Sequence, residues 1–241
     1  MRTLFLLLAL GLVLLPAGCI RDPFLEARLR TPAATTGNPT AGRQQALEVI
    51  RKLKGEVQVD ASDPDKAIVS LDLHGISSAA AILNALGPLP KLRELNLFNT
   101  AFTDADVEPL RRLGNLQTLN LSATYVTDAG MAYLQSLPNL RKLYLNDTRV
   151  TDSGLLYLRG SINLTDLSLF RSPVTDEGVA SLVGLPHLQK LTLGGSRITD
   201  RSLLSVRRLT ELRELYVYTT RVSHSGVEDL KLASPQLKIF H

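Results

Sequence analysis

The chain repeats itself every 24 residues, and this period limits its possible folds more than any other feature. Leucine recurs at that spacing in a first column, which contains Leu92, Leu116, Leu140, Leu164, Leu188 and Leu212. Two more columns follow in the same units: Leu95, Leu119, Leu143, Leu167, Leu191 and Leu215, and then Leu97, Leu121, Leu145, Leu169, Leu193 and Val217. A period of this length indicates an array of small units, each packed only on its neighbours. We therefore predict a solenoid, not a single globular core.

Each unit combines a strand signal with a helix signal. The leucines of L-x-x-L-x-L alternate with variable residues, as in a short strand with one buried face. A Thr or Ser then recurs where the chain turns, and its hydroxyl is expected to satisfy backbone groups of neighbouring turns. The pair Thr-Asp follows at Thr103-Asp104, Thr127-Asp128, Thr151-Asp152, Thr175-Asp176 and Thr199-Asp200. A capping hydroxyl followed by a carboxylate in the first turn indicates a helix start.

The pattern L-x-x-L-x-L-x-x-T-x-V-T-D-x-G-L-x-x-L resembles the leucine-rich repeat family, in a form similar to the cysteine-containing subtype with Thr or Ser in place of Cys. The resemblance covers residues 67–241, with one degraded unit, six full units and a terminal half unit. It implies an α/β solenoid of horseshoe form. The parallel sheet would line the concave face, and short helices would cover the convex face.

The first 18 residues have the pattern of a secretory signal peptide. Arg2 is followed by an apolar run from Leu4 to Leu15, which is too short to span a bilayer comfortably. Ala17 and Gly18 stand directly before Cys19, the single cysteine of the chain. This arrangement resembles the lipobox of bacterial lipoproteins, although Pro16 departs from it. The resemblance implies cleavage before Cys19 and attachment of lipid to its thiol; the alternatives are simple secretion and an uncleaved anchor.

Two segments separate this leader from the array. Residues 19–42 are rich in Pro, Thr, Ala and Gly and have no sustained apolar period, so we predict a flexible tether. Residues 43–66 contain a helical pattern that ends at Gly55, followed by a short alternating strand from Glu56 to Val59. We interpret them as an N-terminal cap, because the end of a solenoid needs a cover for its apolar face.

Strand alternation identifies the side chains expected on the concave face, in three columns. The first contains Ser70, Glu94, Thr118, Lys142, Asp166, Lys190 and Glu214. The second contains Asp72, Asn96, Asn120, Tyr144, Ser168, Thr192 and Tyr216. The third contains His74, Phe98, Ser122, Asn146, Phe170, Gly194 and Tyr218. These columns vary while the buried columns stay leucine, as expected of a scaffold with a specialised surface.

Two sets of residues on this face are candidates for binding. Lys142, Asp166, Lys190 and Glu214 alternate in sign on adjacent strands, either pairing in a row that stabilises the sheet or contacting a partner. The aromatic set is Tyr144, Phe170, Tyr216 and Tyr218, with Phe98 nearer the start of the array. Exposed aromatic side chains on a rigid face are effective anchors, but they also shield a sheet by packing on each other.

Catalytic, metal and nucleic-acid functions find little support. We expect the histidines His74, His187, His224 and His241 to lie far apart in the array, and they lack ligand spacing. No phosphate-binding glycine loop or nucleophile elbow is present, and we expect no cofactor and no metal. The net charge of +4 is scattered along the chain, not clustered on one face as in nucleic-acid-binding proteins.

These observations predict a non-catalytic, membrane-tethered, extracytoplasmic protein-binding module that uses the concave sheet. In a bacterium with two membranes, the residue after Cys19 indicates the outer membrane or the cell surface; without lipidation the protein would be secreted. The alternative is a structural or adhesive component of the cell envelope that binds polysaccharide through the aromatic face. The sequence does not identify the partner.

Overall fold

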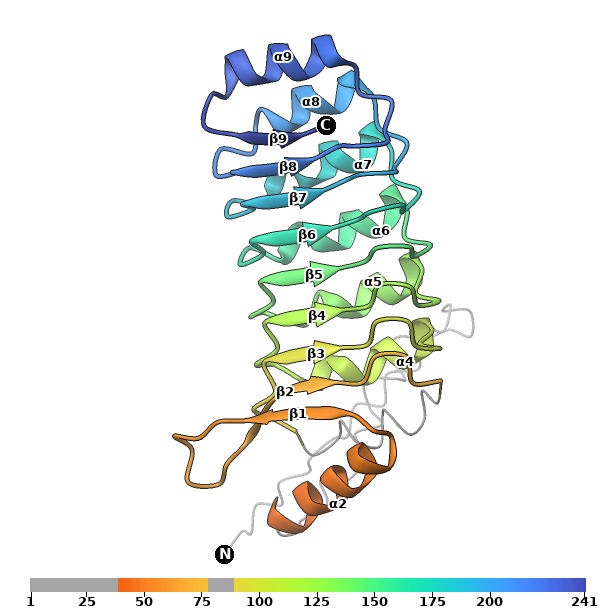
Figure 1. Cartoon of the computed structure of the whole chain (residues 1–241), viewed down its shortest axis with the longest axis vertical. Helices are drawn as coiled ribbons and strands as arrows, with labels where there is room; N and C mark the ends of the chain where they lie inside the picture. Colours follow the sequence, from red (N-terminus) through yellow and green to blue (C-terminus); the bar gives the residue numbers. More distant parts are fainter. Residues whose placement is uncertain (1–38, 78–88) are drawn as a thin grey trace, which may run out of the picture. The chain divides into compact units, whose positions relative to one another are not determined.

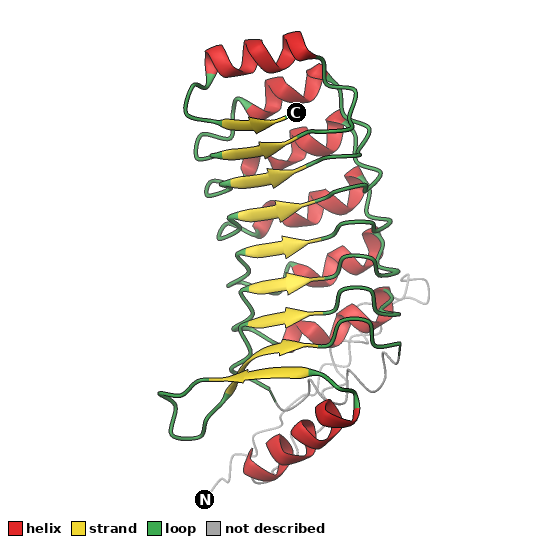
Figure 2. Ribbon diagram, viewed as in Figure 1, coloured by secondary structure: helices red, strands yellow, loops and turns green. Residues whose placement is uncertain are grey.

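The computed structural model describes residues 39–77 and 89–241 of the chain. Strands and helices alternate along it, and the helices of the array lie on one side of the sheet (Figures 1 and 2). The predicted leader, Cys19 and most of the tether lie outside the described residues, as does part of the degraded first unit. The α/β repeat solenoid predicted from the sequence is confirmed.

Within the described residues, nine strands form one sheet in chain order. All neighbouring pairs are parallel except β1 and β2, which are antiparallel. The strands are β1 (Glu56–Val59), β2 (Ile68–Asp72), β3 (Glu94–Asn96), β4 (Thr118–Asn120), β5 (Lys142–Tyr144), β6 (Asp166–Ser168), β7 (Lys190–Thr192), β8 (Glu214–Tyr216) and β9 (Lys238–Phe240). From β2 to β9, each residue pairs with the residue 24 positions further on, as Leu119 does with Leu143.

The leucine columns form the core between sheet and helices. Leu95, Leu119, Leu143 and Leu167, for example, are at most 1% exposed. The predicted helical positions Val107, Met131, Leu155, Val179, Leu203 and Val227 are also buried. Because each unit supplies the same positions, the core runs continuously along the array and needs no disulfide.

The helices begin where the Thr-Asp pairs predict. They are α4 (Asp104–Val107), α5 (Asp128–Leu134), α6 (Asp152–Leu155), α7 (Asp176–Ser181), α8 (Asp200–Val206) and α9 (His224–Ala233), with 3₁₀ segments η1 (Glu108–Arg112), η2 (Leu156–Gly160) and η3 (Leu182–Gly184). Thr127 is the N-cap of α5, and its hydroxyl accepts from the Ala129 N–H. The same capping repeats at Thr151, Thr175 and Thr199.

The aspartate of each pair also joins adjacent units, which the sequence did not predict. Asp104 accepts from the Thr127 N–H and from the Thr127 hydroxyl, both at 2.7 Å, and from the Gly130 N–H at 2.9 Å. The bonds from the N–H and from the hydroxyl of the next unit's Thr or Ser are also made to Asp128, Asp152, Asp176 and Asp200. We call this row of carboxylates the aspartate ladder. It holds the helix starts of successive units in register.

The turn after each strand is held within its own unit. The Thr124 hydroxyl donates to the carbonyl of Leu121 at 2.6 Å, and Thr100, Thr148, Ser196 and Thr220 make the equivalent bond. The expectation that these hydroxyls serve neighbouring turns is therefore wrong for these units. It holds for Ser172, whose hydroxyl donates to the carbonyl of Leu145 in the preceding unit.

The segment before the array contains helix α2 (Pro39–Lys52) and strand β1. The helix begins at Pro39, inside the predicted tether. It ends differently from the prediction, because Lys54, not Gly55, adopts the left-handed conformation, with φ of 59°. Gly55 has another role: a Cβ atom there would lie 2.6 Å from Cδ2 of Leu73, so the glycine allows close packing on the sheet.

Candidate functional site

The outward side chains of β1 to β9 form the concave face, and the register brings the predicted columns into rows. Glu94, Thr118, Lys142 and Asp166 are successive partners in the first row, and Asn96, Asn120, Tyr144 and Ser168 in the second. The antiparallel strand β1 adds two residues that the sequence reasoning did not include: Glu56 opposite Asp72, and Gln58 opposite Ser70. Ser122 was predicted to face outward, but it is 2% exposed.

The alternating charges of the first row form one ion pair within the described residues. Nζ of Lys190 lies 3.1 Å from Oε2 of Glu214. This contact raises the pKa of Lys190 and lowers the pKa of Glu214. Asp166 instead accepts from the hydroxyl of its neighbour Thr165 at 2.6 Å. Lys142 is exposed and forms no ion pair with another described residue, so the predicted row is only partly made.

Three of the predicted aromatic residues meet in one group, which we call the aromatic cluster: Phe170, Tyr216, Tyr218 and, in addition, Phe240. The ring centroids of Phe170 and Tyr218 are 5.6 Å apart, and those of Tyr216 and Tyr218 are 6.4 Å apart with the rings at 87°. Phe240 stacks on Tyr216 at 4.3 Å. Its place in β9, directly opposite Tyr216, follows from the same 24-residue spacing and could have been found from the sequence.

Gly194 allows two non-adjacent strands to contribute to the cluster. A Cβ atom at Gly194 would lie 2.7 Å from Cε2 of Tyr218 and 3.0 Å from its Cζ. With only hydrogen at this position, the Tyr218 ring reaches over the intervening unit to Phe170. The third column is therefore not simply variable, since Gly194 has a defined packing role.

Much of the cluster's surface is already in contact with protein. Tyr216 has Phe240 stacked on its ring at an interplanar angle of 6° and Nζ of Lys190 at 4.9 Å from its centroid. Its hydroxyl donates to Glu214 at 3.0 Å. Arg171 lies 5.9 Å from the Phe170 centroid. Tyr218 and Phe240, 39% and 43% exposed, present the accessible apolar surface.

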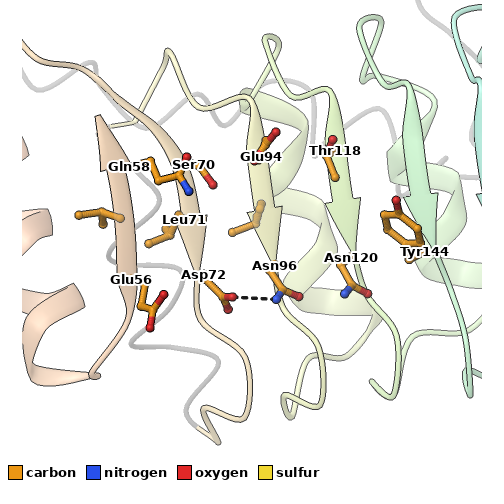
Figure 3. Close-up of a pocket in the computed structure, with 12 residues that line it drawn as sticks. Glu56, Gln58, Ser70, Leu71, Asp72, Glu94, Asn96, Thr118, Asn120 and Tyr144 are labelled. Carbon is orange, nitrogen blue, oxygen red and sulfur yellow. Dashed lines mark hydrogen bonds between the residues drawn. The ribbon is translucent and has the colours of Figure 1, made fainter. Parts of the chain in front are cut away.

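Tyr144 and Phe98 are not part of this cluster. Neither makes a ring contact with another aromatic residue within the described part of the chain. Phe98 is exposed in the third column. Tyr144 borders a hollow at the opposite end of the concave face, in the position shown in Figure 3.

This hollow has a volume of about 300 Å³ and spans β1 to β5. Its polar lining residues are Glu56, Gln58, Ser70, Asp72, Glu94, Asn96, Thr118, Asn120 and Tyr144 (Figure 3). No Lys or Arg is among its lining residues. The concave face thus has two chemically different regions: an acidic, amide-rich hollow at one end and the aromatic cluster with basic neighbours at the other.

Hydrogen bonds fix part of the hollow. One carboxylate oxygen of Asp72 accepts from the His74 N–H at 2.9 Å, and the other accepts from the Asn96 side chain at 3.0 Å. Burial alone would raise the pKa of Asp72, but the hydrogen bonds from His74 and Asn96 outweigh it and hold the pKa below its ordinary value. Asp72 is therefore ionised near neutral pH, and the Asn96 amide has a fixed orientation.

The expectation that the histidines lie far apart was wrong for one pair. The ring centroids of His224, at the start of α9, and His241, at the end of the chain, are 6.3 Å apart, because the chain turns back after α9 to form β9. Even so, no group of three or more His, Cys, Asp or Glu suited to a metal occurs in residues 39–77 and 89–241. None of the helices in this part of the chain has the length and apolar character needed to cross a bilayer.

Comparison with known proteins identifies the repeat. Residues 85–150 match a family described as leucine rich repeat, and residues 160–183 match a second family with the same description. The crystal structure of internalin C2 from Listeria monocytogenes is similar, with a TM-score of 0.58, 22% sequence identity and 80% of each chain covered. A second Listeria monocytogenes internalin, inlF, has a TM-score of 0.51 and 22% identity over 87% of this chain and 72% of the other. At this level of identity the likeness shows the fold alone. A search of curated protein sequences finds no match.

Proposed function

Because this chain is a leucine-rich repeat protein, we propose that it is a non-catalytic module that binds another protein on its concave face. Proteins of this family are generally protein-binding modules, and their curved sheets provide extended binding surfaces. The rigid array supports this role, since its residues are held in register by the sheet, the core and the aspartate ladder. A surface fixed in advance loses little conformational entropy on binding.

The observation that carries the proposal is the aromatic cluster, which shares the concave face with the hollow at its other end. Tyr218 and Phe240 combine large apolar area with few rotatable bonds, which is typical of residues that dominate binding energy. Lys190, Glu214 and Arg171 surround them with charge, in the manner of a polar rim around an apolar centre.

A polysaccharide is less well supported as the ligand. Sugar rings stack on open aromatic faces, and Tyr216 has Phe240 stacked on its ring and Lys190 close to its centroid. The cluster therefore offers ring edges and the surfaces of Tyr218 and Phe240, which suit the side chains of a protein better than a flat stacking platform.

Capture of partners from an envelope extract tests the proposal. The full chain is compared with a variant in which Tyr144, Phe170, Tyr216 and Tyr218 are replaced by Ala, and the captured proteins are identified by mass spectrometry. A matched control replaces Tyr125 and Tyr157, which are exposed outside the concave face, by Ala. We expect one stoichiometric partner that the control retains and the four-residue variant loses. Unchanged capture by that variant, with its fold intact by circular dichroism, would contradict the proposal.

We also propose that the module works outside the cytoplasm, attached to a membrane through lipid on Cys19. The support is the signal-like segment before Cys19 and the lipobox resemblance of Ala17, Gly18 and Cys19. The segment between Cys19 and α2 would then act as a tether, with an average reach of roughly 22–26 Å. Such a tether would let the concave face meet partners close to the membrane surface.

A further inference from the structure

Two carboxylates in the hollow differ from the other acidic groups of the concave face. Asp166 accepts from Thr165, and Glu214 is bound by Lys190 and Tyr216. Glu56 and Glu94, in contrast, form neither a hydrogen bond nor an ion pair through their side chains with any other described residue. Both are exposed and both line the hollow (Figure 3).

The arrangement around these two carboxylates is open to a ligand. Glu56 on β1 is opposite Asp72 on β2, and Glu94 on β3 is the register partner of Ser70 on β2. Asn120 adds a fixed amide: its carbonyl oxygen accepts from the Ser122 N–H at 3.0 Å, and its NH₂ group has no partner among the described residues. Tyr144 closes the far side with its ring and hydroxyl.

The charge of the hollow selects the chemistry of its occupant. Three carboxylates line it, and no lysine or arginine is among the lining residues. Asp72 has Nδ1 of His74 2.8 Å from one of its oxygens, whereas Glu56 and Glu94 have no such neighbour among the described residues. A guanidinium or ammonium group can take several carboxylate and amide oxygens at once, and an aromatic ring such as that of Tyr144 also attracts a cation. A neutral or acidic group in the hollow would not offset the negative charge of the carboxylates.

We propose that the hollow takes an arginine or lysine side chain from an extended segment of the partner protein, and that this segment crosses the strands to place an apolar side chain on the aromatic cluster. The inference rests on the proposed function and adds the chemistry of the ligand. Both regions lie on one face, and the five steps from β3, which carries Glu94, to β8, which precedes Tyr218, span roughly 24 Å at about 4.8 Å per strand. An extended chain covers that distance in about seven residues.

The inference is tested with synthetic peptides. Fluorescent peptides of Gly, Ser and Thr carry one Arg and one Phe about seven residues apart, the spacing that the strand geometry implies. Reference peptides carry citrulline, a neutral isostere, in place of Arg. Binding to the full chain is measured by fluorescence anisotropy. The test variant is Glu56→Gln with Glu94→Gln, and the matched control is Asp166→Asn, in the same row as Glu94 but outside the hollow. Thermal melting checks that all variants are folded.

We expect the unaltered chain to bind the Arg peptide about ten-fold tighter than the citrulline peptide. The double Gln variant should lose this discrimination, and Asp166→Asn should keep it. Added salt should weaken binding of the Arg peptide to the unaltered chain more than binding to the double Gln variant. Equal affinity for the two peptides, or equal loss in the Asp166→Asn control, would overturn the inference. Displacement of the Arg peptide by neutral oligosaccharides, unaffected by the double Gln change, would also overturn it and indicate a sugar site.

Failure of this inference can be told from failure of the proposed function. If the chain captures a protein partner through its aromatic residues but does not discriminate Arg from citrulline, only the cationic occupant is wrong. If neither protein nor peptide binds, both proposals fall.

Discussion

The ring of Tyr218 packs against Gly194, so closely that a Cβ atom at Gly194 would lie 2.7 Å from Cε2 of the tyrosine. This contact lets Tyr218 reach Phe170 across the unit between them. The apolar centre of the concave face therefore depends on a residue that has no side chain of its own.

Replacing Gly194 by Ala should displace the Tyr218 ring and leave the fold intact, because the atoms nearest to the added Cβ belong to that side chain and not to the backbone. We expect an altered near-ultraviolet circular dichroism spectrum. The free energy of unfolding should fall by about 0.5–1.5 kcal/mol, the contribution of one aromatic pair. Gly184→Ala is the control, since nothing lies within 4 Å of a Cβ atom there. An unchanged near-ultraviolet spectrum for Gly194→Ala would show that the packing is not as described.

Stacking of Tyr216 on Phe240 should couple the last two strands energetically. In a double-mutant cycle of Tyr216→Ala and Phe240→Ala, measured by urea unfolding, we expect a coupling of about 0.5–1.5 kcal/mol. Leu232, which is 83% exposed on α9, provides a comparison in which Ala should change stability by less than about 0.5 kcal/mol. Additive losses from the two aromatic changes would mean that the stacked rings contribute independently.

The aspartate ladder should be a main source of stability between units. Asp128→Ala removes two bonds to a charged acceptor from Thr151 and leaves a half-buried N–H without its partner. We expect a loss of about 2–3 kcal/mol in the free energy of unfolding. Asp229, an exposed aspartate on α9, should tolerate the same change within about 0.5 kcal/mol. Equal effects at the two sites would remove the ladder's special role.

Acid should weaken the last step of this ladder. Hydrogen bonds from the hydroxyl and then the N–H of Ser223 hold the pKa of Asp200 below its ordinary value of 3.8. A depressed folded-state pKa contributes stability that is present above the unfolded value and is lost as the pH falls through the folded one. The melting temperature of the unaltered chain should therefore fall more steeply below about pH 4 than that of Asp200→Asn. Parallel acid profiles for the two proteins would contradict this.

Lipid attachment at Cys19 makes a separate prediction. When the full chain is produced in a bacterium, Cys19→Ser should shift it from the membrane fraction to the soluble fraction and abolish labelling by a fatty-acid analogue. Cysteine occurs once in the chain, so any label on the unaltered protein reports this position alone. A chain that stays in the membrane fraction without label would exclude the lipid anchor.

The sequence predicted the array because its strongest signals are local and repeated. Leucine columns, Thr-Asp starts and strand alternation each depend on neighbours at fixed spacing, and Leu119, Thr127 and Asn120 lie where these patterns place them. The rows of the concave face followed from the same arithmetic. Ser122 was an exception: it is 2% exposed, and its hydroxyl oxygen accepts from the Asn146 N–H of the next unit at 3.1 Å.

The chemistry of the face was less predictable because side chains choose among several neighbours. The alternation of charge allowed Asp166 to pair with the lysines of the adjacent strands, but Asp166 accepts a hydrogen bond from the hydroxyl of Thr165, its neighbour in sequence. The hollow was missed because it depends on the antiparallel direction of β1, and alternation in Glu56 to Val59 indicates a strand without giving its direction. Gly194 carried no visible signal, since its role depends on the ring that lies above it.

From β2 to β9, each strand residue pairs with the residue 24 positions further on. Each unit therefore lengthens the array by one identical step. Duplicating one whole unit, such as residues 139–162, would leave each leucine, each capping threonine and each ladder aspartate with a correct neighbour on both sides. Adding such a unit would move the hollow and the aromatic cluster apart by one strand spacing, about 4.8 Å. The length of the array would then set which partner segments can reach both ends, independently of the residues that contact them.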